Sequence, residues 1–332
     1  MRVEILELLR CPQCAGRLTL QDAHTLDGRV EFGSLLCAGG EHRYPIRSFI
    51  PRFVSGSNYA DNFGAQWRKF RQTQLDSYSG HSISAERFWK ATGWTAQQIA
   101  GQWVLDAGCG AGRFAEIALQ AGAKVVALDY SNAIDACYAN LKQHPNLYPI
   151  QGNIYALPFA PGAFPYVYSF GVLQSTPDVA AAFAALPPMV AEGGRLSVDF
   201  YEKSWGSALL PKYWLRPVTK RMPQERLFAL LEVWVPRLWS LSCVLGRIPV
   251  AGRGLRRLVP VVNYTGVLPL SKQQQLEWAL LDTFDWYGPA YDSLQTARTL
   301  ARWSRQAGLQ QIEVTRAGHL VARGVVRHAT GD

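Results

Sequence analysis

The sequence predicts an α/β protein whose parallel sheet ends in a C-terminal antiparallel hairpin. From residue 102 onward, short apolar stretches alternate with helical patterns, and only the turn Ala317-Gly318 separates the last two apolar stretches. Strands that alternate with helices form parallel sheets with right-handed crossovers. We expect a small β-rich unit before this core and a mostly helical insertion within it. With 332 residues and 48% hydrophobic side chains, the chain can bury a sizeable core.

The elements of the core follow from these patterns in chain order. Strands are predicted over 103–107, 124–128, 147–151, 165–169 and 194–201, with a final pair over 310–316 and 319–326. Helices are predicted over 112–121, 133–143, 179–190 and 294–307. The expected domains are a β unit at 1–55, a helical connector and cofactor cap at 56–100, a core made of 101–201 and 291–327, and a cap insertion at 202–290.

The net charge of +9 belongs to one segment of the chain. Residues 203–260 contain eleven basic and two acidic side chains, so the remainder of the chain is neutral. This distribution argues against a generally basic nucleic-acid coat protein. It indicates one basic element on a neutral body.

The N-terminus and the cysteine count favour a cytoplasmic protein. Glu4, Glu7 and Arg10 interrupt any apolar stretch that could serve as a signal peptide. No uncharged apolar run of about eighteen residues predicts a spanning helix. Six cysteines in a chain of this length do not suggest a disulfide framework. We expect a cytoplasmic location, or peripheral attachment at the inner membrane surface.

A glycine-rich turn follows the first core strand, with glycines at 108, 110 and 112. Glycines let the backbone approach a ligand closely, and the next helix presents free N–H groups. Position 113 is Arg, where a dinucleotide fingerprint needs glycine. Asp106 disfavours a pyrophosphate and suits a cationic group, whereas Asp129 at the end of the second strand can accept ribose hydroxyls. S-adenosylmethionine, a nucleoside with an amino-acid tail, fits both acids.

Five segments together resemble the motifs of class I S-adenosylmethionine-dependent methyltransferases, most of all the branch of the ubiquinone and menaquinone methyltransferases. The segments read VLDAGCGAGRF (104–114), ALDYS (127–131), GNIYALPF (152–159), FPYVYSFGVLQSTPD (164–178) and EGGRL (192–196). The resemblance implies a Rossmann-like methyltransferase sheet. It also implies a cofactor site made of Asp106, Gly108, Gly110, Asp129, Tyr130, Asn153, Ile154 and Phe170. A Rossmann-like domain that binds another ligand is the alternative.

The chain departs from the family pattern at three places. Asn153 stands where the family has Asp, Pro165 replaces a second Asp, and Gln174-Ser175 replaces a pair that contains His. The last change removes one candidate base. These departures bear on catalysis more than on cofactor binding. They leave open a non-catalytic module that binds only the cofactor or a partner.

Four N-terminal side chains have the spacing of a zinc site. Cys11 and Cys14 form a Cys-x-x-Cys pair, and Cys37 is followed by His42 after four residues. Thiolates and an imidazole can close a tetrahedral zinc site. The surrounding sequence resembles zinc-ribbon modules of rRNA guanine methyltransferases and of a small tRNA methyltransferase activator, which implies a structural Zn²⁺. A degenerate ribbon that has lost its metal is the alternative.

The catalytic base need not lie in the core, because methyl transfer from a sulfonium depends mainly on positioning and desolvation. The candidates are His81, Tyr201, Asp282, Asp285 and Tyr287. Residues 281–292 are dense in acids and aromatic rings, and we expect a substrate-facing loop there, with a hydrophobic loop capped by acids as the alternative. Five residues of the connector could close the cofactor pocket or pack in the core, namely Tyr59, Phe63, Trp67, Gln74 and Asp76.

The insertion interleaves arginines with Trp205, Trp214, Trp234 and Trp239. Three interpretations compete: a contact with anionic lipid, an RNA-binding surface, and a substrate cap with a solvated basic face. The predicted function is an S-adenosylmethionine-dependent methyltransferase that acts on a small or lipid-linked molecule by direct in-line transfer. The alternative is an rRNA or tRNA methyltransferase that holds RNA with the zinc ribbon and the insertion. The oligomeric state stays open.

Overall fold

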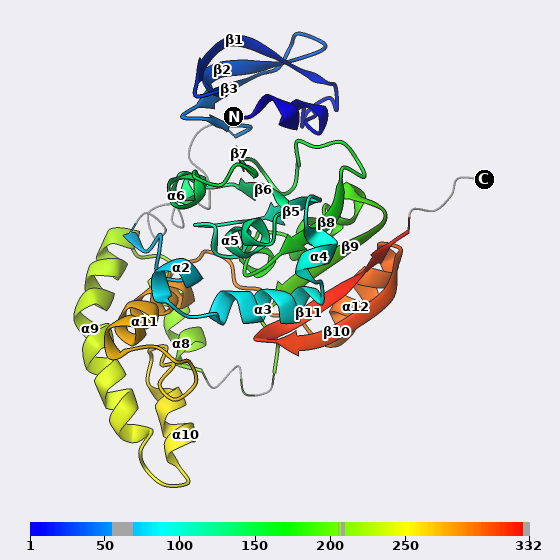
Figure 1. Ribbon diagram of the computed structural model, residues 1–332. Coiled ribbons are helices and arrows are strands. Elements are labelled where there is room, and N and C mark those ends of the chain that lie inside the picture. Colours follow the sequence, from blue (N-terminus) through cyan, green and yellow to red (C-terminus); the bar gives the residue numbers. More distant parts are fainter. Residues whose placement is uncertain (55–68, 205, 207–209, 328–332) are drawn as a thin grey trace.

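The computed structural model describes residues 1–54, 69–204, 206 and 210–327, and the α/β core lies at its centre (Figure 1). Seven strands form one sheet in the order β10-β11-β9-β8-β5-β6-β7. Their bounds are Trp103–Ala107 (β5), Lys124–Asp129 (β6), Leu147–Gln151 (β7), Phe164–Ser169 (β8), Val190–Phe200 (β9), Leu309–Ala317 (β10) and His319–Val326 (β11). Strands β5 to β9 are parallel, and β11 pairs antiparallel with both β9 and β10. The predicted sheet with its C-terminal hairpin is confirmed.

Successive residues of the central strands point to two different apolar layers. On one face, Leu105 and Val126 pack with side chains of α7 (Val179–Ala184) and α12 (Ala297–Gln306). On the other face, Val104 and Val125 pack with α3 (Ile83–Thr92), α5 (Arg113–Gln120) and α6 (Ala133–Leu141). A parallel sheet buried on both faces needs apolar residues at nearly every strand position, as these strands have.

The N-terminal unit is an antiparallel sheet in the order β1-β2-β3-β4. Its elements are the 3₁₀ helix Val3–Glu7, β1 (Leu18–Leu26), β2 (Arg29–Cys37), β3 (Arg43–Arg47) and β4 (Ile50–Pro51). The unit lies over the β6–β7 side of the core (Figure 1). Its Ile5, Leu9 and Leu35 belong to the same apolar cluster as Leu105 and Ile150 of the core. The unit therefore shares its hydrophobic core with the α/β sheet.

The insertion is mostly helical, as predicted, and forms the helical cap together with part of the connector. The cap helices are α2 (Asp76–Ser79), α8 (Pro211–Thr219), α9 (Gln224–Leu245), α10 (Gly252–Leu255) and α11 (Lys272–Tyr287). Helix α4 (Ala96–Ile99) packs on the core instead, with Ile99 in the same apolar cluster as Val104. Leu227, Leu231 and Val235 of α9 pack with Phe284 and Tyr287 of α11. The cap therefore has an apolar core of its own.

The expectation of a loop over residues 281–292 is wrong for its first part. Residues 281–287 belong to α11, which begins with a capping box between Ser271 and Gln274. Trp278, Leu281 and Phe284 recur at helical spacing and are buried. The dense acids and aromatic rings concealed this spacing in the sequence.

Other differences from the predicted bounds have local causes. The helix predicted over 179–190 ends at Ala184, because Pro187 and Pro188 cannot continue it. Strand β9 begins at Val190, four residues earlier than expected, because Val190 already pairs with Phe164 ahead of the register shift, where Gly194 lies against the backbone of Pro165. The predicted aromatic residues Tyr59, Phe63, Trp67 and Trp205 lie outside the described residues.

Candidate active site and metal site

A cavity of about 610 Å³ opens at the carboxyl ends of the parallel strands. One half is lined by the turns after β5, β6 and β8. The other half is lined by the helical cap together with Tyr201, which follows β9, and His319, which begins β11. Ligands of open α/β sheets bind at this end of the strands. The cavity therefore joins a cofactor-like half to a second half under the cap, which we call the acceptor half.

The turn after β5 needs glycine at its first position. Gly108 has φ +94°, and a Cβ atom there would lie 2.4 Å from Cγ2 of Val172. The N–H groups of Gly108 and Cys109 donate to the carbonyl of Leu128 at 2.7 and 2.9 Å. The backbone of this turn is thus fixed against β6 and β8, and it faces the cavity without a side chain at position 108.

Asp129 lines the cavity at the end of β6. Its Oδ2 accepts from the N–H of Gly110 at 2.9 Å, and its Oδ1 accepts from the N–H and Oγ of Ser131 at 2.9 and 2.8 Å. Burial raises the pKa of Asp129, and these hydrogen bonds oppose the rise. A carboxylate has about four acceptor positions. Asp129 therefore retains capacity for a ribose hydroxyl.

Asp106 lies beneath the glycine turn and outside the cavity lining that the described residues define. Burial raises its pKa to about 8, the hydroxyl of Tyr168 on the paired strand opposes this rise, and the charge of Asp129 adds to it. Among the described residues, Oδ2 of Asp106 has no hydrogen-bond partner. A buried acceptor without a partner fits a cationic ligand group that would complete its hydrogen bonding.

Six of the eight predicted cofactor residues line the cavity: Gly108, Gly110, Asp129, Tyr130, Ile154 and Phe170. The side chain of Asn153 instead accepts from the N–H of Tyr155 at 3.0 Å and closes a local turn. An open glycine backbone, a carboxylate with an acceptor position left and apolar walls suit a nucleoside with an amino-acid tail. The residues present therefore fit S-adenosylmethionine.

Three of the five candidate catalytic residues line the cavity, namely Tyr201, Asp282 and Asp285. The other two lie outside its lining as the described residues define it. Tyr287 is buried in the cap and donates to the carbonyl of Pro260 at 3.4 Å. His81 lies between α2 and α3 and is half-buried.

The acceptor half of the cavity contains linked tyrosines and acids. Tyr264 donates to Oδ2 of Asp282 at 2.5 Å, and Gln74 donates to its Oδ1 at 3.1 Å. Tyr201 donates to Oδ2 of Asp285 at 3.5 Å. Burial raises the pKa of Asp282, and it raises the pKa of Tyr201 well above its usual value. Tyr201 therefore stays protonated and can donate a hydrogen bond but not accept a proton.

His319 lines the same half and was missed by the sequence reasoning. Its ring meets the Tyr201 ring edge to face, with centroids 4.8 Å apart. Burial, reinforced by the charge of Arg87, lowers the pKa of His319 to about 4. The imidazole is thus neutral at physiological pH and keeps a nitrogen lone pair that faces the cavity, although this environment makes it a weaker base than an exposed histidine. The pairing of Leu320 with Phe200 places His319 at the carboxyl end of β9, so the predicted hairpin contained the necessary signal.

Two arginines of the cavity wall were also missed. Arg87 forms an ion pair with Asp199, whose other oxygen accepts from the N–H of Gly171 at 2.6 Å. Arg113 donates to Oγ of Ser84 at 2.9 Å and lies over the ring of Trp278. Burial lowers the pKa of Arg113 to about 10, so it remains charged at neutral pH. A sequence cannot show that two separate helices place both cations in one wall.

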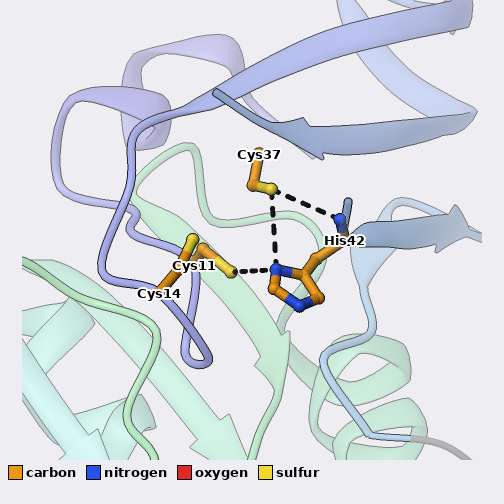
Figure 2. Close-up of side chains that lie close together, drawn as sticks. All are labelled: Cys11, Cys14, Cys37 and His42. Carbon is orange, nitrogen blue, oxygen red and sulfur yellow. Dashed lines mark hydrogen bonds between the residues drawn. The ribbon is translucent and has the colours of Figure 1, made fainter. Parts of the chain in front are cut away.

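The four predicted metal ligands come together in the N-terminal unit (Figure 2). Their ligand atoms all lie within 4.8 Å of one another. Nδ1 of His42 is 3.5 Å from Sγ of Cys11 and 3.6 Å from Sγ of Cys37, and Cys14 points toward the same centre. Three thiolates and one imidazole form a donor set that suits tetrahedral zinc and leaves no open position. The residues fit a structural ion, although zinc binding itself stays a prediction.

The metal ligands are connected to the cofactor half by backbone hydrogen bonds. The N–H of Arg10, next to Cys11, donates to the carbonyl of Pro158 at 2.9 Å, and the N–H of Ala160 donates to the carbonyl of Leu8 at 2.8 Å. Residues 152–160 contain Ile154, which lines the cavity. The N-terminal unit therefore braces the loop after β7.

The sequence of the α/β core is similar to a known protein family. Residues 105–198 match the sequence model of the family described as "Methyltransferase domain". Residues 105–198 thus belong to a methyltransferase domain. The predicted family resemblance is thereby confirmed for the core.

Curated relatives of this methyltransferase domain include the ubiquinone biosynthesis O-methyltransferase of Albidiferax ferrireducens. It is 34% identical over 100 residues, which is 29% of this chain and 40% of the relative. The demethylmenaquinone methyltransferase of Thermobifida fusca is 33% identical over 122 residues, 35% of this chain and 51% of the relative. The chain thus spans about half the length of the curated relatives that it matches.

Solved structures of methyltransferases are similar in outline. The magnesium protoporphyrin IX methyltransferase of Synechocystis is 14% identical, with TM-score 0.43 and coverage of 81% of this chain and 97% of that one. The human N-acetylserotonin methyltransferase is 12% identical, with TM-score 0.44 and coverage of 82% and 61%.

Replacing Asp129 tests the cofactor half. We expect Asp129→Ala to weaken S-adenosylmethionine binding by about 1–3 kcal/mol, because a charged acceptor for ribose is lost. Isothermal titration calorimetry measures this change. Asp285→Asn, in the acceptor half, is the matched control and should leave the affinity within about twofold. An unchanged Kd in Asp129→Ala would reject the pocket assignment.

The raised pKa of Asp106 predicts proton release on cofactor binding. With a pKa of about 8, roughly nine-tenths of the free protein carries the proton at pH 7. A cationic ligand favours the carboxylate, so binding should release close to one proton, measured by calorimetry in buffers of different ionisation enthalpy. Asp106→Asn should release none. Equal proton release by both proteins would contradict this role for Asp106.

The metal site predicts one equivalent of zinc that stabilises the whole chain. Cys14→Ser should lose the ion and lower Tm by about 5–10 °C, because metal-binding free energy contributes to folding. Elemental analysis and thermal unfolding measure both effects. Cys243→Ser in the cap is the matched control and should retain zinc. Less than half an equivalent in unchelated wild-type protein would support the degenerate ribbon instead.

Proposed function

We propose that the protein transfers a methyl group from S-adenosylmethionine to a small or lipid-linked acceptor that carries a quinol-like ring. One observation carries this proposal: a single cavity joins the glycine turn and Asp129 to a half lined by tyrosines, tryptophans and a neutral histidine. The names of the curated relatives, which methylate ubiquinone and menaquinone precursors, support the same class of acceptor.

The acceptor half suits a flat, hydroxylated ring. Tyr201, Trp278 and Trp286 provide aromatic surfaces, and Leu281 adds an apolar contact. Aromatic rings stack or meet edge to face at favourable energy. The hydroxyl of Tyr201 stays protonated and donates to Asp285, so its lone pairs can accept from a hydroxyl of the ring and orient it.

The chemistry is a single displacement, for which the cofactor supplies an electrophilic methyl group on sulfur. The cap excludes water and holds the acceptor hydroxyl near His319. The neutral imidazole accepts the hydroxyl proton as the new oxygen–carbon bond forms and the sulfur–carbon bond breaks. Positioning accounts for much of the rate of such a step, and a base adds about 10²–10⁴-fold.

The RNA alternative rests on the ribbon and the basic insertion. Part of the basic charge is used inside the cap, which weakens this alternative. Lys212 is buried and forms a 2.7 Å ion pair with Asp292. Arg216 is buried and donates to the carbonyls of Trp286 and Pro289. Cations paired within the protein are not available to phosphates.

Turnover with defined acceptors tests the proposal. Purified protein with labelled S-adenosylmethionine and short-chain hydroxylated benzoquinols or naphthoquinols should yield a methylated product, identified by mass spectrometry. His319→Ala should lower kcat by about 10²–10⁴-fold with an unchanged cofactor Kd, because only the proton acceptor is lost. With a pKa of about 4, His319 remains the basic form down to about pH 5, so kcat/KM should not fall near pH 6.5.

Three outcomes would contradict the proposal. A wild-type rate in His319→Ala would remove the histidine from the mechanism. Methylation of tRNA or rRNA transcripts, with no product from any quinol, would favour the RNA alternative. Failure to bind S-adenosylmethionine at all would indicate the non-catalytic module.

A further inference from the structure

The outer face of α9 is apolar and exposed. Five apolar side chains with 44–59% exposure recur at helical spacing along this face: Leu230, Val233, Trp234, Leu241 and Val244. We call them the outer stripe. The helix lies along the edge of the molecule farthest from β10 and α12 (Figure 1). Isolated exposed apolar residues are ordinary, but a stripe along one helix marks a binding surface.

The opposite face of α9 is already used. Leu227, Leu231, Val235 and Trp239 are buried in the cap, with Phe284 in the same apolar cluster. By length and composition α9 could cross a membrane, and 28% of its most apolar stretch is buried. Its packing against the cap argues against spanning, because the cap core would have to open. The helix instead has one face for the protein and one for a partner.

The charges on the outer face of α9 are positive. Arg226 and Arg237 fall on the same side as the outer stripe, since positions 226, 230, 233, 237, 241 and 244 recur every three to four residues. The guanidinium of Arg237 lies 5.9 Å from the ring centroid of Trp234. The two acids of the helix, Glu225 and Glu232, lie outside the outer stripe. Glu232 forms a 2.6 Å ion pair with Lys69.

The turn after α9 extends the same apolar surface. Ile248 and Val250 are exposed there, and Val250 has φ +60°, which is unusual for a β-branched residue. Arg247 precedes them and is exposed. Figure 1 places this turn at the tip of the molecule, at the end opposite the N-terminal unit. The outer stripe and the tip together form an apolar edge with three arginines.

This combination fits an anionic bilayer better than a second copy of the chain. A two-fold contact through the outer stripe would bring Arg226 and Arg237 of both copies together, without an acid in the stripe to pair them. At a bilayer, apolar side chains and tryptophan enter the boundary of headgroups and acyl chains, while arginines reach the lipid phosphates. Each basic side chain near an anionic surface adds to this attraction.

We propose that the outer stripe and the tip dock the protein on an anionic membrane surface. Apolar side chains of the same cap, Val267 and Leu268, line the cavity. If the proposed function holds, docking would bring this cavity to the surface from which a lipid-linked acceptor is drawn. The docking itself does not depend on the identity of the acceptor.

Vesicle flotation with the full-length protein tests the docking. Wild-type protein should float with vesicles of phosphatidylcholine containing about a third phosphatidylglycerol, and much less with phosphatidylcholine alone, because the arginines need anionic headgroups. The pair Trp234→Ser and Val244→Ser, and separately Arg237→Glu, should each lower the bound fraction about tenfold. Matched controls are Phe32→Ser and Arg298→Glu, exposed residues on the N-terminal unit and α12, which should bind as wild type.

Two further measurements distinguish a loss of docking from a loss of folding or of cofactor binding. Thermal unfolding and S-adenosylmethionine affinity should be unchanged in the stripe variants, since none of these residues lines the cavity. Vesicle binding without methylation of quinols would support docking and reject the proposed acceptor. Methylation of soluble quinols without vesicle binding would reject docking alone.

Three results would overturn the proposal. The first is no flotation of wild-type protein at low salt, and the second is equal flotation of the stripe variants. The third is evidence for a different partner. Light scattering could show a dimer that Trp234→Ser disrupts, and such a dimer without vesicle binding would assign the outer stripe to a second copy. A tRNA gel shift that Arg237→Glu abolishes and Trp234→Ser leaves intact would assign the arginines to RNA.

Discussion

The carboxyl ends of the parallel strands are held in place by two acids that bind glycine turns, and both halves of the cavity depend on them. Asp129 accepts from Gly110 after β5, and Asp199 accepts from Gly171 after β8. Asp199 also pairs with Arg87 of α3, so the second acid ties the sheet to the helix that covers the cavity. Charge-assisted hydrogen bonds of this kind are short and directional. They fix the backbone where a ligand must approach it, before any ligand is present.

The strands and the cofactor half could be predicted from the sequence because each signal is local. Apolar runs of five or six residues, a glycine turn and an acid at a strand end lie within one segment of chain. Asn153 illustrates the limit of this reasoning, since a motif position identifies the residue but not whether its side chain faces the ligand or closes its own turn. Asp106 is similar, because its place beneath the turn depends on how β5 and β8 pair.

The acceptor half could be predicted only in part because its residues come from separated elements. Tyr201 follows β9 and His319 begins β11, so the sheet places these two side by side, whereas only the packed cap adds Asp282 of α11 to the same wall. The role of the basic charge in the insertion could also be predicted only in part. The sequence shows a basic insertion, but burial divides it into cations such as Lys212, which stabilise the cap, and cations such as Arg237, which remain at the surface. Composition alone cannot make that division.

The N-terminal unit covers sheet surface that a crossover helix would otherwise cover. The connection from β7 to β8 contains no helix among its described residues, and Leu9 and Leu35 of the N-terminal unit occupy the same apolar cluster as Ile150 of β7. Removing that unit would expose a strip of the central sheet to water. The two sheets should therefore unfold in one cooperative transition, so that the small unit acts as an integral layer of the protein rather than as a detachable module.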